Sequence, residues 1–459
     1  MRRHRTNLRR NLRPNLGHNS RRNRERGIVI MLVAVFMLFV VGAMAALAID
    51  VVTLYTARSE AQLAADGAAL AAARVLANSG ATSDPNASSD GLMANAWNLA
   101  TAVALQVAEQ NQVGGMNLTS SQVAIPSAPG GNLPTNPTFT ISVQVTNLPT
   151  FFARIWGRKQ IAVSASATAE VYNPSGAYKL EVATTRVAPM CVKPWLLPNI
   201  SPTPGNSSTL KIFDPATGAV LDLALLGWET TTIPPQPPPP PPIRLRTACS
   251  TNCDPSTVPA PKPWRYYPGT TDATGSFPAP SASSVVCPSC TTPYELSIAG
   301  CVQTPISCNG TVQVDTNNYP TRDTETAAAV DDLTHSSANG GDSVDTTAAP
   351  SPPFQFLAGA ENPVPGAAGN VVMVSDSMVT VPVINVDSTT TPWPPAGYPS
   401  VQIIGFVQLF LNPTGAVSPA NGHIRTQVIN LAGCGLNATG TPILGNGASP
   451  VTVRLISPP

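Results

Sequence analysis

Residues 27–77 read GIVIMLVAVFMLFVVGAMAALAIDVVTLYTARSEAQLAADGAALAAARVLA, an apolar run followed by an alanine-rich segment. Its first part, residues 27–49, contains 23 residues and no charge. As a helix it would extend about 34 Å, slightly more than the roughly 30 Å hydrocarbon core of a bilayer. Arginines precede it immediately and Asp50 follows it. Because Arg and Lys gather on the cytoplasmic side, the sequence predicts a single-pass inner-membrane helix with a cytoplasmic N-terminus and an exported remainder, periplasmic or extracellular.

A cleaved signal peptide is the competing interpretation of the same segment. Ala46, Leu47 and Ala48 offer small residues at the spacing of a cleavage site. Signal peptides, however, have apolar cores of only about 7–15 residues. The length therefore favours a retained anchor, while a secreted adhesin or surface-binding protein released after Ala48 stays open as the alternative.

Composition and charge narrow the class of protein further. Only 11% of the 459 residues are Asp, Glu, Lys or Arg, and 49 are proline; soluble domains average about 25% charged residues and 5% proline. Residues 1–26 hold ten Arg and one Glu, a net charge of +9, so the rest of the chain carries −8. A basic tail before an acidic body is a topology signal and not a nucleic-acid footprint. We expect a membrane partner, no nucleic-acid partner and no compact cytosolic enzyme.

Residues 50–77 continue as strong helix formers without proline, so we expect one unbroken helix from Gly27 to Ala77. Gln62 and Asp66 lie four residues apart and can pair on its surface. Small residues also recur at three- and four-residue steps and form a narrow stripe along one face of this helix: Ala57, Ala61, Ala64, Ala68, Ala71 and Val75. The stripe belongs either to a plain alanine-rich stalk or, as we predict, to a face on which a helix of another protein packs closely.

Three motifs in this region resemble the N-terminal region of TadE/TadG-like proteins of the Flp, or tight-adherence, pilus-assembly group. They are the apolar run ending in A-I-D (Gly27 to Asp50), L-Y-x-A-R (Leu54 to Arg58) and Q-L-A-A-D-G-A-A-L-A-A-A (Gln62 to Ala73). The resemblance covers about fifty residues. It implies a pilin-like bacterial envelope protein that helps to build or anchor a pilus and contacts the pilus-assembly machinery through the Gly27–Ala77 helix.

Prepilins are cut after a glycine, and most carry Glu five residues later. Gly27 is present here, but Leu32 stands where that Glu would be. This departure argues against processing after Gly27 and against a role as the major pilus subunit.

The segment after the long helix carries a helix signal and then strand signals. Residues 90–113 predict a second helix that ends at Gly114 and Gly115. Apolar and polar residues alternate over 139–145 and 161–170, which is typical of half-buried antiparallel strands. The link between them, NLPTFFARIWGRKQ, is expected to form a short helical plug. A long helix followed by a small sheet is the layout of a pilin-like protein.

Later segments are rich in proline and then return to strand patterns. The run of prolines at 233–242 predicts a polyproline spacer. Phe213 to Leu223 reads as a hairpin, and Glu325 to His335 as a short helix. Asn370 to Val386, Val401 to Leu411 and His423 to Leu431 predict strands. The second of these is apolar on both faces, so it belongs in the middle of a sheet.

The predicted fold class is α+β: a single N-terminal transmembrane pilin-like helix followed by an exported, mostly antiparallel β body with proline-rich and disulfide-rich segments. The expected divisions are a basic cytoplasmic tail (1–26), the transmembrane helix (27–49), an alanine-rich helical stalk (50–115), a small pilin-like β region (116–180), a β/loop region (181–232), a proline- and cysteine-rich segment (233–310), a flexible acidic linker (311–352) and a C-terminal β module (353–459).

All eight cysteines follow the apolar span. In an oxidising compartment an even number predicts structural disulfides, with the pairing open. Cys287-Pro-Ser-Cys290 is a C-x-x-C pair. With Cys249 and Cys253 it offers an alternative zinc site. A redox role is the third reading, disfavoured because no helix is expected to follow the pair. The cysteines are Cys191, Cys249, Cys253, Cys287, Cys290, Cys301, Cys308 and Cys434.

Signals for catalysis are sparse. Of four histidines, only His335 and His423 lie in the exported part, and neither has a nearby acid or cysteine in the sequence. Some relatives carry a metal-binding von Willebrand A domain, whose D-x-S-x-S motif is broken at Asp376-Ser377-Met378. The acids from Asp331 to Asp345 lack calcium-loop spacing. We therefore predict a non-enzymatic protein with no catalytic, cofactor-binding or metal-ligating residue and no cofactor.

Overall fold

The computed structural model describes most of the chain except the N-terminal tail and several loops. The polyproline run, Cys249 and Cys253 lie outside the described residues. The described residues are 19–84, 87, 91–128, 136–150, 152–157, 159–175, 186–202, 210–227, 229–230, 264, 266–315, 322–336, 340–345, 352–386, 399–413, 417–418, 423–435, 442–444 and 449–456.

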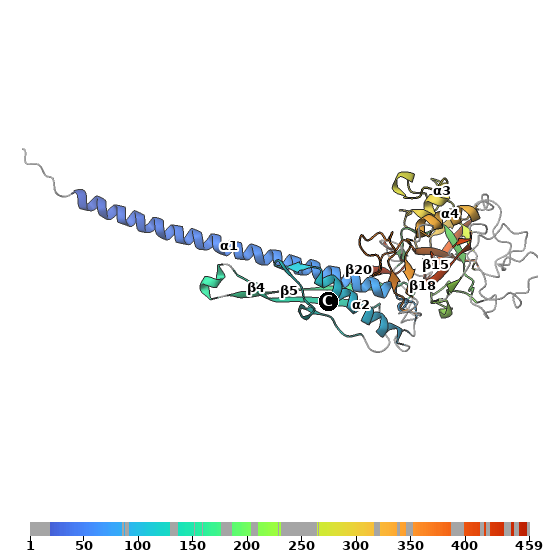
Figure 1. Cartoon of the computed structure of the whole chain (residues 1–459), viewed down its shortest axis with the longest axis horizontal. Coiled ribbons are helices and arrows are strands. Elements are labelled where there is room, and N and C mark those ends of the chain that lie inside the picture. Colours follow the sequence, from blue (N-terminus) through green and yellow to red (C-terminus); the bar gives the residue numbers. More distant parts are fainter. Residues whose placement is uncertain are drawn as a thin grey trace, which may run out of the picture.

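The long helix α1 (Asn19–Ala77) is unbroken, as predicted, and begins eight residues before Gly27. Its apolar span projects from the rest of the molecule as a single rod (Figure 1). Large side chains there are exposed, for example Leu32 at 68% and Phe39 at 73%. The helix is long and apolar enough to cross a membrane by length and composition. From Ala57 onward, one face of the same helix is buried in the chain.

A four-stranded antiparallel sheet, here the N-terminal sheet, packs against that part of α1. Its order is β20-β5-β4-β3. The predicted alternation is confirmed: Phe139, Ile141 and Val143 are all fully buried, and the residues between them are not. Helix α2 (Leu92–Glu109) joins this core through Trp97, whose ring centroid lies 4.4 Å from that of Phe139. The strands are β3 (Val123–Ala124), β4 (Thr138–Pro149), β5 (Gln160–Tyr172) and β20 (Thr452–Ile456).

The small-residue stripe of α1 is used differently from the prediction. Ala61, Ala64 and Ala68 have no exposed surface, and Ala57 and Val75 are 2% exposed. They belong to one core with α2 and the strands β4 and β5. The stripe is therefore already occupied by this chain, and the prediction that it receives a helix from another protein is wrong. Small side chains allow any neighbouring element to approach closely. In this chain the neighbours are its own second helix and sheet, not a helix of another protein.

The second helix ends earlier than the sequence suggested. Residues 112–113 leave the helix and pair with 116–117 as the hairpin of β1 (Gln112–Val113) and β2 (Met116–Asn117). Gly114 and Gly115 form its two-residue turn with φ of 60° and 77°. Such turns need positive φ at both positions, which glycine adopts at little cost. The Gly114-Gly115 pair, from which we predicted the end of the helix, therefore forms the turn of a hairpin.

A second, larger sheet of seven strands, here the large sheet, organises the rest of the chain. It runs β8-β18-β15-β14-β7-β9, with β10 also on β15. Strand β15, predicted for the middle of a sheet, lies between β14 and β18. All pairs are antiparallel except β14 with β7. The strands are β7 (Trp195–Pro198), β8 (Glu229–Thr230), β9 (Tyr267–Pro268), β10 (Thr311–Gln313), β14 (Met378–Ile384), β15 (Ser400–Leu411) and β18 (Thr426–Gly433).

This sheet draws strands from every segment between 181 and 459, because pairing partners lie far apart in the sequence. The segment 311–352, expected as a flexible linker, differs most from its expectation. Its described part contains β10 and helix α4 (Arg322–Thr334), which extends the predicted short helix. Arg322, largely buried, pairs with Asp315 at 2.7 Å and also with Glu325. These ion pairs join the start of α4 to the residues that follow β10.

Smaller elements complete the described structure. Helix α3 (Pro293–Ala299) is the remaining α-helix, and Phe213 bridges Val220 in the predicted hairpin. The other elements are η1 (Ser120–Gln122), η2 (Ala153–Trp156), η3 (Leu223–Leu225), η4 (Ala282–Ser284), β6 (Val187–Ala188), β11 (Ser343–Val344), β12 (Phe356–Leu357), β13 (Val371–Val372), β16 (Val417–Ser418), β17 (His423–Ile424) and β19 (Ile443–Leu444).

A buried polar cluster joins the end of α1 to the middle of the large sheet. Asn430 on β18 donates to the carbonyl oxygen of Ala77, the last helical residue, and to Oε1 of Gln408 at 2.6 Å. Gln408 on β15 donates in turn to Oδ1 of Asn78 at 3.1 Å. Removing one partner of such a buried network costs about 1–3 kcal/mol. The end of α1 is therefore hydrogen-bonded to the large sheet as well as packed against the N-terminal sheet.

Three disulfides close the described part of the β body, which confirms the prediction that its cysteines form structural disulfides. Cys191–Cys301 and Cys308–Cys434 join residues 110 and 126 positions apart. Cys287–Cys290 joins residues only 3 positions apart. The long-range pairs tie the large sheet to its loops.

A buried lysine makes the stability of this body dependent on pH. Lys193 donates from Nζ to the carbonyl oxygens of Ile298 and Gly300, the latter at 2.8 Å, at the end of α3. Burial lowers the pKa of Lys193 to about 8. Unfolding restores the ordinary value near 10.4, so above pH 8 the unfolded chain binds more protons than the folded one. Stability then rises with pH.

We expect the unfolding free energy of the full chain in detergent to rise between pH 8 and 10 by an amount on the order of 2 kcal/mol through this residue. The measurement is denaturant unfolding at several pH values. In Lys193→Met, which keeps the aliphatic stem but carries no charge, this rise should disappear. An equal pH slope in both proteins would contradict the assignment.

Candidate functional site on the outer face of the long helix

The part of α1 that follows the apolar span has a second face, which its own chain leaves open. A shallow groove of about 370 Å³ lies there between α1 and the start of β5. The helix contributes Leu54, Tyr55 and Arg58, and the strand contributes residues 161–164. Tyr55 is 73% exposed. The groove therefore presents an aromatic ring and a guanidinium directly after the apolar span.

A second groove, of about 280 Å³, lies along the same face of α1, about two helical turns further from the apolar span. It is lined by Gln62 and Asp66 of α1, residues 166–168 of β5, and Leu455 and Ile456 of β20. Gln62 donates to Oδ1 of Asp66 at 2.8 Å, which confirms the pairing predicted from their spacing. Gln62 also donates to the carbonyl oxygen of Ser166 at 3.2 Å, so the pair is fixed against the sheet.

The second and third motifs of the long helix contribute to two different faces. The alanines of the third motif form the core with α2 and the N-terminal sheet. The polar and aromatic members Tyr55, Arg58, Gln62 and Asp66 line the two grooves. The chain thus buries the small-residue stripe and leaves these four side chains, here the polar seam, accessible. The seam residues are spaced at three to four positions, which is a signal the sequence carried but which the alanine stripe outweighed.

Directly after the apolar span, Asp50 fixes the tip of the β4–β5 hairpin to α1. Its carboxylate is 4% exposed. Oδ2 accepts hydrogen bonds from the backbone N–H of Phe152 at 3.1 Å and of Ala153 at 2.6 Å, at the start of η2. Donors at the beginning of a helical turn are the usual partners of a carboxylate. The first charged residue after the apolar span is therefore used to hold the hairpin tip at that depth.

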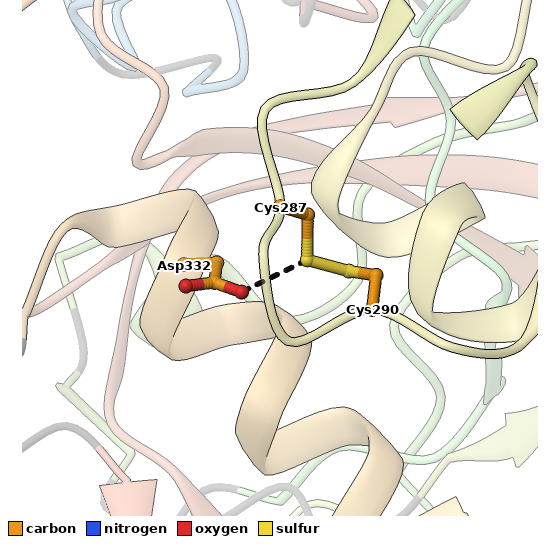
Figure 2. Close-up of side chains that lie close together, drawn as sticks. All are labelled: Cys287, Cys290 and Asp332. Atoms are coloured by element: carbon orange, nitrogen blue, oxygen red, sulfur yellow. Dashed lines mark hydrogen bonds between the residues drawn. A yellow bond between two sulfur atoms is a disulfide. The ribbon is translucent and has the colours of Figure 1, made fainter. Parts of the chain in front are cut away.

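The C-x-x-C pair lies elsewhere, on the loop before α3. Figure 2 shows Cys287 and Cys290 bonded to each other, with Asp332 of α4 pointing at Cys287. Oδ2 of Asp332 lies 2.9 Å from Sγ of Cys287 and also accepts from the N–H of Ser289 at 3.3 Å. Ligand atoms of all three residues lie within 4.8 Å of one another.

Bonded to each other, these cysteines offer no thiolate to a metal, so the oxidised pair does not fit zinc. The expectation that no helix follows the pair is wrong, because α3 begins three residues after Cys290. Thr292 caps α3 and accepts from the N–H of Glu295 at 3.3 Å. The sequence already carried this signal, since T-P-Y-E is a capping box with proline at the first helical position.

The remaining sequence candidates do not converge on a second site. His335, expected to lack an acid, lies 3.6 Å from the carboxylate of Asp376, which the fold brings close from 41 positions away. The side chain of His423 lies outside the described residues. Asp331 accepts from Ser336, whereas Asp342 binds Asn362 at 2.8 Å. In the described part of the chain, the acids from Asp331 to Asp345 form no common cation site.

Comparison with known proteins places the N-terminal segment. Residues 27–75 match the Tad family model, TadE/G-like Flp pilus assembly. No curated protein and no solved structure matches the chain. The matched segment contains the apolar span, the buried alanines of the third motif, and Tyr55, Arg58, Gln62 and Asp66. The resemblance drawn from the three motifs is therefore confirmed, and over residues 27–75 this chain carries a TadE/G-like segment of the Flp pilus-assembly type.

Proposed function

We propose that the chain is a membrane-anchored, non-enzymatic component of an Flp/Tad-type pilus-assembly apparatus. Residues 27–49 cross the inner membrane, the basic tail stays in the cytoplasm, and both sheets lie on the exported side. The polar seam receives a protein of the assembly machinery, and the large sheet carries the surface that contacts other envelope structures.

One observation carries this proposal: the exposed apolar span and the buried helix of the folded domain are parts of a single helix. Apolar side chains that no part of the chain covers are stable in lipid and unfavourable in water. Cleavage after Ala48 would cut within this helix, two residues before the buried Asp50. The continuity therefore supports a permanent anchor over a released adhesin.

The seam supports docking of a partner over an enzymatic role. Tyr and Arg are enriched where protein surfaces recognise one another, and both stand exposed in the first groove. The grooves are shallow, in contrast to the deep, mostly apolar pockets that bind small molecules.

A crosslinking experiment in the native host tests anchor and docking together. The photoreactive amino acid benzoylphenylalanine replaces Tyr55, and the N-terminal residue of the mature protein is sequenced from membrane and secreted fractions. We expect an intact N-terminus in membranes and crosslinks to membrane proteins of the pilus machinery. The same probe at Val286, 89% exposed on the β body, is the control for an exposed position outside the seam.

Each other outcome has a defined meaning. A start at Ile49 in the secreted fraction would reject the anchor and favour the adhesin. A start at Ile28 would show prepilin-type processing and place the protein in the pilus itself. Identical crosslinks at Tyr55 and Val286 would reject the seam as the docking surface.

A further inference from the structure

The hairpin tip lies at the depth where α1 leaves its apolar span. Asp50 is the first charge after that span, and it binds the backbone of Phe152 and Ala153. Thr150 and Lys159 close the loop through a backbone hydrogen bond of 3.4 Å. Figure 1 shows the hairpin running beside the middle of α1, with its tip toward the projecting half of the helix. A membrane around residues 27–49 would therefore meet the hairpin tip at its surface.

Three exposed cations surround this tip, against the single buried carboxylate of Asp50. Arg154 and Lys159 of the hairpin and Arg58 of α1 are all exposed. Within the described residues, none of these three side chains forms an ion pair or a hydrogen bond. Arg454, in contrast, is neutralised by Glu170 at 2.7 Å on the neighbouring strand pair. Exposed cations without partners are attracted to anionic lipid headgroups when a membrane surface lies within a Debye length of them.

Helix geometry brings Arg58 to the same level. Eight residues separate it from Asp50, which is about 12 Å along the axis. Because side chains of a helix tilt toward its N-terminus, the long side chain of Arg58 can reach back toward the apolar span. Tyr55, one turn nearer, is an aromatic residue of the kind enriched at membrane interfaces. The groove lined by Arg58 also includes residues 161–164, at the start of β5, and Lys159 precedes that strand.

We infer that Arg58, Arg154 and Lys159 form a lipid-binding collar, in which they bind the phosphates of anionic phospholipids on the exported face of the membrane. This inference rests on the proposed membrane anchor and deepens it. The collar fixes the depth and the tilt of the helix, so that the hairpin, and through Asn430 the large sheet, take a defined orientation above the bilayer.

Amide hydrogen exchange of the full chain in lipid nanodiscs tests the collar. Nanodiscs of phosphatidylcholine alone are compared with nanodiscs that also contain phosphatidylglycerol. Each Lys or Arg near an anionic surface is worth about a fivefold change in binding. We expect phosphatidylglycerol to slow exchange of residues 150–160 by at least about tenfold. The double variant Arg154→Glu/Lys159→Glu should lose this protection, and Arg58→Glu, which leaves the hairpin unchanged, should reduce it.

Lys211→Glu, the same charge change on the β body, is the control and should retain the protection. Equal exchange in both lipids, or variants that behave as the wild type, would overturn the inference. Slowing by inorganic phosphate in phosphatidylcholine nanodiscs would show that the site binds free phosphate, which also overturns it. Co-purification with the nanodiscs separates the two proposals: a chain that does not insert rejects the anchor, whereas an inserted chain whose hairpin ignores lipid charge rejects the collar alone.

Discussion

Replacing Cys308 and Cys434 by serine is expected to lower the unfolding free energy of the chain by about 5 kcal/mol, the largest effect of any change considered. The bond joins residues 126 positions apart. Its removal lets the unfolded chain explore a long open loop, and the entropy gained grows with loop length. Both cysteines are 1% exposed and belong to a buried cluster that includes Ile403 and Phe406 of β15.

The C-x-x-C pair supplies the matched control. Cys287→Ser/Cys290→Ser removes a bond between residues 3 positions apart. The same loop-closure entropy then predicts a loss of only about 2 kcal/mol. Denaturant unfolding of the two double variants measures the difference, with the remaining disulfides kept oxidised. Equal losses would show that strain or local contacts, and not loop length, set the contribution of these bonds.

The contrast between the two pairs shows what a sequence can and cannot determine. Local patterns were informative: the alternation through Ile141 placed β4, and the two-faced apolar run placed β15 between two neighbours. Pairing is non-local, so the sequence left the cysteine connectivity open. The same limit explains the segment 311–352, whose acids indicated a linker because the partner of Asp315, Arg322, gave no sign of being buried.

The long helix shows the limit at the level of a surface. A stripe of small residues predicts that another structural element packs closely against it, but it does not identify that element. Sequence reasoning assigned another protein's helix, and the structure assigns α2 and the N-terminal sheet. The common face of Tyr55, Arg58 and Gln62, which line the two grooves, was detectable from their spacing. Its neighbour Asp50 was not, because its hydrogen bonds reach a hairpin 102 positions away.

Enlarging the stripe therefore tests the fold of this chain. Ala68→Leu is expected to lower the unfolding free energy by about 3 kcal/mol, because Ala68 has no exposed surface and extra carbons force the helix away from its core. Ala64→Leu should act similarly. Denaturant unfolding of the full chain in detergent measures both, and hydrogen exchange should show faster opening of α2 and β4.

Leu63→Ala is the control on the same helix, since Leu63 is 66% exposed and its truncation leaves no cavity. Its expected effect is within about 0.5 kcal/mol. If the leucine variants stayed as stable as the wild type while losing crosslinks from position 55, the stripe would be a docking face after all. If they unfold the domain while the apolar span remains in the membrane, packing within the chain and anchoring are separate tasks of one helix. The continuity of α1 through Asp50 then has a physical reason: the half that folds the domain must emerge from the half that holds it in lipid.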